Sequence, residues 1–202
     1  MNAQPQEKTY MTPEAYLALE RASLDIKHEY VDGEIFAMTG AKKNHILINA
    51  NMTRELGNRF KTDKSTCKVL PSDMRVKIES NGGYVYPDIA VACGDLEFED
   101  NQLDTLINPI VIIEIFSDST ELYDRTDKVA CYRAIPTLQD YILVSQKQYH
   151  VEQFTRKEGR TWKMVYYDDI RQSIQIESIG CEVSLSEIYW DIKFEDGTES
   201  SR

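Results

Sequence analysis

The sequence lacks the features that mark membrane and exported proteins. No apolar run approaches the ~18 consecutive residues that a membrane-spanning helix needs. The first residues, Met1 to Lys8, are polar and lack the apolar core of an export signal. We therefore expect a cytoplasmic protein that does not interact with membranes.

Cysteine is scarce, with four residues at positions 67, 93, 131 and 181 and no Cys-x-x-Cys pair. This wide spacing does not favour a zinc knuckle or a dense disulfide framework. We expect four free and mostly buried thiols, and no organic cofactor.

Basic residues are fewer than acidic ones, since the chain has 23 lysines and arginines against 34 aspartates and glutamates, for a net charge of −11. Such a balance argues against a protein that coats nucleic acid, whose affinity comes mainly from phosphate contacts. A nuclease can still concentrate basic residues on one cleft face. One segment gathers six candidates: Lys42, Lys43, Arg54, Arg59, Lys61 and Lys64.

The length of 202 residues and the hydrophobic fraction of 42% suit one domain with a real core. We expect a disordered segment over 1–9, a single domain over 10–192 and a polar tail over 193–202. The mixture of strand and helix patterns predicts an α/β or α+β domain, with a mixed sheet flanked by helices and additional hairpins.

The predicted elements follow from caps, turns and periodicity. Thr12-Pro13 begins a helix to Ala22, and Asp32-Gly33 forms the type I′ turn of a hairpin over 28–38. Further helices are expected over 43–60 and 121–134, and a loop over 94–108. Strands are expected over 66–70, 73–79, 84–92, 110–116, 141–144, 148–156, 161–168, 173–177 and 181–184.

Two carboxylates interrupt apolar runs that have the character of buried strands. Glu114 lies within 111–116, and Asp88 lies within 86–92, 26 residues earlier. A lone buried carboxylate is costly unless a cation, hydrogen bonds or a cleft compensates it. Two of them on neighbouring strands are typical of a divalent-metal phosphodiesterase, where hard oxygen ligands bind Mg²⁺.

The helix after Glu114 carries Thr120, Asp124, Lys128 and Tyr132 at four-residue steps, which places all four on one helix face. If this face looks toward the strand of Glu114, Lys128 reaches the metal site as a cation that stabilises the transition state or orients water. Asp124 is then expected to pair with Lys128.

Together these motifs resemble the PD-(D/E)XK nuclease superfamily, which has the restriction-endonuclease-like fold. Its lysine normally comes two residues after the glutamate, where this chain has Phe116. The Uma-type restriction endonuclease family, common in cyanobacteria, shows the same departure. In that family a glutamate, two serines and a threonine are followed by Asp and Lys at four-residue steps, which is similar to 114–120, Asp124 and Lys128 in this chain. The family also has an acidic N-terminal hairpin, a methionine and a helix histidine, which are similar to 29–34, Met38 and His45. The resemblance covers roughly 12–190.

The resemblance implies a four-stranded mixed core sheet, a homodimer, and Mg²⁺-dependent cleavage of DNA that leaves a 5′-phosphate, with Mn²⁺ as an alternative metal. It implies that Asp88 and Glu114 bind the metal, that Lys128 takes the migrated lysine role and that Glu29 is a further catalytic acid. Asp124, Tyr132 and His45 would support them.

Each of these residues also has a purely structural interpretation. Asp88 would cap a turn or bind a buried arginine such as Arg75, and Glu114 would form an ion pair. Lys128 and Glu29 would be solvated, and His45 would pack at a surface. At the level of function, the alternatives are a weakly active or inactive nuclease fold used for binding or assembly, and a phosphodiesterase acting on something other than duplex DNA.

Overall fold

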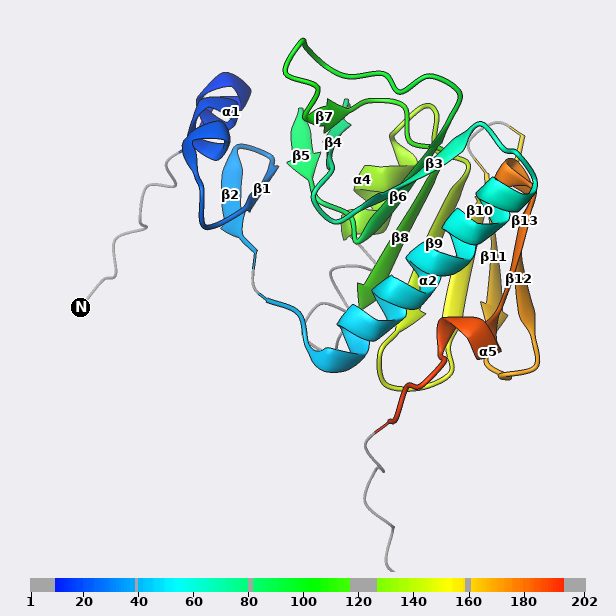
Figure 1. Ribbon diagram of the computed structural model, residues 1–202. Coiled ribbons are helices and arrows are strands. Elements are labelled where there is room, and N and C mark those ends of the chain that lie inside the picture. Colours follow the sequence, from blue (N-terminus) through cyan, green and yellow to red (C-terminus); the bar gives the residue numbers. More distant parts are fainter. Residues whose placement is uncertain (1–9, 39, 80–81, 117–126, 159–160, 195–202) are drawn as a thin grey trace, which may run out of the picture.

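Strands dominate the architecture, in two sheets and a separate hairpin (Figure 1). The computed structural model describes residues 10–38, 40–79, 82–116, 127–158 and 161–194. The larger sheet has six strands in the order β11-β10-β9-β8-β6-β3. Their bounds are β3 Cys67–Pro71, β6 Ile89–Cys93, β8 Val111–Phe116, β9 Asp140–Ser145, β10 Val151–Arg156 and β11 Trp162–Tyr167.

The larger sheet is mixed, because β8 and β9 pair in parallel while its other neighbours are antiparallel. Every residue of β8 and β9 is buried, which explains why both strands are mainly apolar. Helix α2, Lys43–Thr62, runs along one face of this sheet (Figure 1). Its buried residues Ile48, Met52 and Leu56 share a core with β6 and β8. Helix α4, Asp127–Arg133, contributes Val129 and Tyr132 to a second core that includes Phe116.

The smaller sheet has five strands in the order β2-β1-β5-β4-β7. Helix α1, Pro13–Ala22, packs near it and begins as predicted, since the hydroxyl of Thr12 accepts a hydrogen bond from the amide of Ala15. The bounds are β1 His28–Val31, β2 Glu34–Ala37, β4 Arg75–Ile78, β5 Gly83–Val85 and β7 Thr105–Leu106. The turn residues Asp32 and Gly33 both have positive φ, as a type I′ turn requires.

The C-terminal part adds a two-stranded hairpin and a short helix against the α2 side of the larger sheet. The elements are β12 Ser173–Ile176, the 3₁₀ helix η1 Glu177–Ile179, β13 Cys181–Ser184 and α5 Leu185–Ile188. None of the helices in the described ranges combines the length and hydrophobicity that a membrane crossing requires.

Two predicted features are wrong in detail, although the fold class is confirmed. The strand expected over 84–92 is divided at Tyr86-Pro87-Asp88 into β5 and β6, which belong to different sheets. The loop expected over 94–108 contains β7, which pairs in parallel with β4. In both cases pairing with a distant strand decides the structure, and local periodicity does not report it. The larger sheet has six strands because the hairpin expected over 148–156 and 161–168 joins it as β10 and β11.

The expectation of four free thiols is also wrong, because Cys67 and Cys93 form a disulfide. The two residues are register partners on the antiparallel strands β3 and β6. Cross-strand register brings their side chains together in spite of the 26-residue separation. Cys131 and Cys181 do not take part in this bond.

Candidate active site

Asp88 lies where the chain passes from the smaller sheet to the larger one, directly before β6. Its Oδ2 accepts a hydrogen bond of 2.7 Å from the amide of Ile115. Its own amide lies 3.3 Å from Oε2 of Glu114 and donates to it. Because β6 and β8 are antiparallel neighbours, the two carboxylates that the sequence singles out come together at one point of the sheet.

Glu114 is held by two side chains of α4. Its Oε1 accepts hydrogen bonds from the hydroxyl of Tyr132 at 2.6 Å and from Nζ of Lys128 at 3.1 Å. The four-residue spacing of Lys128 and Tyr132 presents both to the same carboxylate, as helix periodicity predicts. Glu114 is only 5% exposed, and these donors compensate the cost of its burial.

A second carboxylate reaches Lys128 from the smaller sheet. Glu29 on β1 is 8% exposed, and its Oε1 lies 3.5 Å from Nζ of Lys128. The same oxygen accepts a hydrogen bond from the amide of Tyr86, just before Asp88. One partly buried ammonium therefore lies between two buried carboxylates, from β1 of the smaller sheet and β8 of the larger one.

The first turns of α2 approach Asp88 from the other side. Nε2 of His45 lies 2.8 Å from Oδ1 of Asp88, and the side-chain amide of Asn49 donates a 3.1 Å hydrogen bond to the backbone carbonyl of Asp88. Asn49 was not predicted from the sequence. Its position four residues after His45, on the same helix face, is the signal that would have identified it.

The electrostatics of the cluster raise the pKa of two supporting residues. Burial lowers the pKa of His45, but the hydrogen bond to Asp88 and the charges of Asp88 and Glu114 outweigh burial and leave it above its ordinary value of 6.5. Complete burial, followed by the charges of Glu114 and Glu29, raises the pKa of Tyr132 well above its ordinary value. Tyr132 therefore stays protonated and acts as a hydrogen-bond donor.

We expect the imidazole of His45 to titrate above pH 6.5 in the metal-free protein, and to titrate at a lower pH in Asp88→Asn. A raised pKa in the folded state means that the protonated ring stabilises the fold. This contribution is complete below about pH 6.5 and is lost as the pH rises through the folded-state value. Ring resonances followed by NMR against pH in EDTA would measure it. A midpoint at or below 6.5 in the wild type contradicts the assigned contact.

The structure tests the alternative interpretations of these residues as well. Asp88 does not bind Arg75, whose guanidinium contacts Asp104 at 2.9 Å and Thr105 instead. The side chain of Lys128 is 12% exposed and is therefore not a solvated helix residue. Glu114 does form an ion pair, with Lys128, as its structural interpretation expects. Asp124 lies outside the described residues.

The donor chemistry at this point fits a magnesium ion. Asp88 and Glu114 offer hard carboxylate oxygens. Together with Glu29 they carry three negative charges, which outnumber the single positive charge of Lys128 when His45 is neutral. Among the described residues, no three His, Cys, Asp or Glu side chains stand close enough together to enclose a metal by themselves. Mg²⁺ is commonly held by one or two carboxylates, with water and substrate phosphate completing its shell. Asp88 and Glu114 would be those two ligands, with a backbone carbonyl next to Glu114 as a third.

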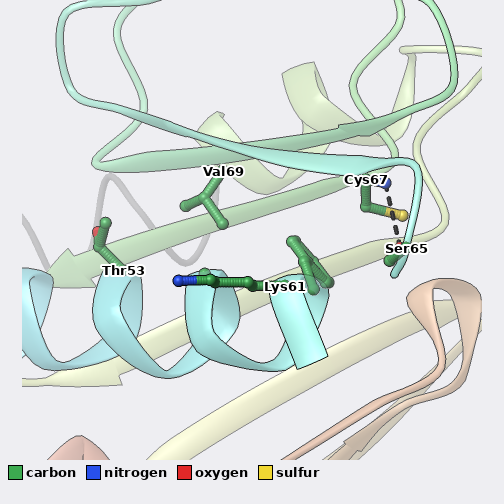
Figure 2. Close-up of a pocket in the computed structure, with 7 residues that line it drawn as sticks. Thr53, Lys61, Ser65, Cys67 and Val69 are labelled. Carbon is green, nitrogen blue, oxygen red and sulfur yellow. Dashed lines mark hydrogen bonds between the residues drawn. The ribbon is translucent and has the colours of Figure 1, made fainter. Parts of the chain in front are cut away.

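The pocket in Figure 2 is separate from this cluster. It has a volume of about 440 Å³ and lies between the second half of α2 and strand β3. None of the residues that line it belongs to the carboxylate cluster.

Two of the basic candidates on α2 are already paired, Arg54 with Glu55 and Arg59 with Asp63. Lys42 and Lys43 are exposed at the start of α2, beside His45.

Comparison with known proteins supports the family that the motifs indicate. The model of the Uma2 family, described as "Putative restriction endonuclease", matches residues 13–186. Two similar proteins are from Synechocystis sp., and both are described as uncharacterized. The protein slr1290 is 32% identical over 91% of this chain and 94% of its own length. The protein sll1609 is 34% identical over 75% of this chain and 84% of its own length.

A solved structure from Anabaena variabilis, described as "a putative nuclease belonging to DUF820", shares the fold. Its TM-score is 0.72 at 17% identity, over 89% of this chain and 97% of the other. At this low identity the likeness extends to the fold and not to the reaction.

Proposed function

The chain belongs to the Uma2 family of putative restriction endonucleases, and on that premise we propose that it is a Mg²⁺-dependent endonuclease that hydrolyses phosphodiester bonds of DNA. One observation carries the proposal. Asp88, directly before β6, meets Glu114 on the adjacent strand β8, and Lys128 reaches Glu114 from α4. This set contains the acids and the cation that metal-assisted phosphodiester hydrolysis needs.

The absence of a lysine at position 116 does not weaken the proposal. Phe116 is 5% exposed and belongs to the core that α4 covers. The ammonium of Lys128 lies 3.1 Å from Glu114, so an amine is available at the carboxylate from a different element. The chemistry depends on where the charge lies and not on which position in the sequence supplies it.

Each residue has a defined task in the proposed reaction. When bound, Mg²⁺ would supply a polarised water and neutralise charge on the phosphate. Asp88 and Glu114 would hold it, with Mn²⁺ as a substitute. Lys128 would orient the attacking water or stabilise charge that develops on the phosphate oxygens. Glu29 would hold Lys128 in position from the opposite side.

His45 and Tyr132 would fix the geometry of the two acids. The hydroxyl of Tyr132 donates to Oε1 of Glu114, while Oε2 of Glu114 accepts a hydrogen bond from the amide of Asp88. His45 contacts Oδ1 of Asp88, while the amide of Ile115 contacts Oδ2. Both carboxylates are thereby held in position before a metal or a substrate arrives, which reduces the reorganisation that the reaction requires.

We expect wild-type protein to bind Mn²⁺ or Mg²⁺ in a calorimetric titration, and Asp88→Asn to bind at least about 10-fold more weakly. The asparagine keeps the shape of the side chain but removes the negative charge that attracts the ion. The titration is repeated with a DNA oligonucleotide present, because substrate phosphate can complete the metal shell.

Equal metal binding by the two proteins, with or without DNA, would contradict the assigned ligands. A wild type that binds no metal under either condition would favour the alternative function, a nuclease fold used for binding or assembly. The net charge of −11 is the observation that favours this alternative.

A further inference from the structure

Strand β2 exposes large apolar side chains at the edge of the smaller sheet. It is an edge strand, at the β2 end of the order β2-β1-β5-β4-β7. Phe36 is 48% exposed, and Met38, just after the strand, is 37% exposed. Edge strands are normally protected by charge or by a covering element, because open apolar edges promote aggregation. An exposed aromatic ring at such an edge points to a binding surface.

The register of the hairpin places Phe36 next to the carboxylate cluster. Phe36 is the partner of Glu29 across β1 and β2. Directly opposed residues of antiparallel strands project from the same face of the sheet, with Cβ atoms about 5 Å apart. Glu29 lies 3.5 Å from Lys128, so the ring of Phe36 borders the proposed active site. Met38 follows two residues later, whereas Ile35 projects from the opposite face.

Two lysines, Lys42 and Lys43, follow Phe36 in the sequence. Strand β2 leads into the start of α2 (Figure 1). The exposed residues Lys42 and Lys43 precede His45, which contacts Asp88. An aromatic ring and two exposed lysines therefore lie on the segment that leads to His45. Proteins that bind single strands combine these groups, because the rings stack on bases and the cations pair with phosphates.

We propose that Phe36 stacks on an unpaired nucleobase next to the scissile phosphate. The preferred substrate is then single-stranded or locally unpaired DNA. In an intact duplex both faces of each base are covered by the neighbouring base pairs, and a ring on the rim of the site has no base face to contact. This inference rests on the proposed function and specifies its substrate class.

The test compares Phe36→Ala with two matched variants, Phe36→Trp and Ile35→Ala. Ile35 is 39% exposed on the same strand, but on the opposite face, and serves as the control. Binding of a fluorescent single-stranded oligonucleotide is measured by anisotropy in EDTA, and 2-aminopurine in the oligonucleotide reports stacking directly. We expect Phe36→Ala to bind about 5-fold to 150-fold more weakly, the loss that corresponds to one stacked base. Phe36→Trp and Ile35→Ala should stay within about 3-fold of the wild type.

The outcomes separate this inference from the proposed function. If the wild type binds and cleaves DNA but Phe36→Ala and Ile35→Ala behave alike, the stacking role is wrong and the nuclease remains. If the wild type neither binds nor cleaves any oligonucleotide, both proposals fail. If Phe36→Ala converts a dimer to a monomer in light scattering with no change in DNA binding, the edge of β2 is a contact between two copies of the chain and the stacking role is overturned.

Discussion

Replacing Glu114 by Gln or Asp88 by Asn is expected to lower the rate of Mg²⁺-dependent DNA cleavage by about 10³-fold or more. Both substitutions keep the shape of the side chain. They remove the negative charge of the two groups that would hold the metal, and a neutral amide is a poor ligand for a hard cation. The measurement is single-turnover cleavage of an end-labelled oligonucleotide.

A matched control for Glu114→Gln is available in Glu99→Gln. Oε1 of Glu99 accepts hydrogen bonds from Lys77 at 2.6 Å and from the hydroxyl of Tyr84 at 2.8 Å. It therefore has the same kinds of partners as Glu114, a lysine and a tyrosine, but lies beside the smaller sheet, away from Asp88. We expect Glu99→Gln to cleave at the wild-type rate. This control shows whether the loss of a partly buried ion pair is enough to slow cleavage, or whether the loss requires a change in the active site.

Replacing Lys128 by Met is expected to lower the free energy of unfolding by about 3–5 kcal/mol in metal-free buffer at neutral pH. The substitution keeps the apolar stem and removes the ammonium that lies between Glu29 and Glu114, whose side chains are 11% and 6% exposed. Two buried carboxylates then lose their shared cation, and the cost of desolvating them is no longer offset. Urea denaturation in EDTA would measure the change.

A double-mutant cycle with Glu114→Gln tests the cause of this destabilisation. If the buried charge of Glu114 is responsible, Lys128→Met should cost clearly less in the Glu114→Gln background. Lys77→Met is the control, because its ion pair with Glu99 is more exposed and should contribute about 1 kcal/mol or less. Wild-type stability in Lys128→Met would show that the ammonium is solvated and that the contacts with both acids are wrong.

The predictable parts of the site depend on local sequence. A carboxylate inside the fully buried strand 111–116 needs a compensating partner, and this requirement singles out Glu114 from the sequence alone. The spacing of Lys128 and Tyr132 indicates the helix face that supplies the partner. The helix cap at Thr12 and the hairpin turn at Asp32-Gly33 are likewise predictable, because the residues themselves restrict the local backbone.

The features that local sequence does not predict depend on contacts between distant segments. Cys67 and Cys93 bond because β3 and β6 pair in one particular register, and nothing near either cysteine reports that register. The division of 84–92 at Asp88 arises because β5 and β6 pair with strands of different sheets. Asn49 contacts the backbone of Asp88 only once α2 has packed on the larger sheet. The burial of Glu29 likewise depends on how the two sheets meet.

The most direct test of the metal-dependent mechanism is cleavage by wild-type protein and Glu114→Gln, purified in parallel and assayed on the same oligonucleotides in Mg²⁺ and in EDTA. We predict cleavage by the wild type in Mg²⁺, none in EDTA, and a loss of about 10³-fold or more in the variant. Equal cleavage by the two proteins would show that a contaminating nuclease or a different site is responsible. Cleavage by the wild type that persists in EDTA would contradict the metal-dependent mechanism.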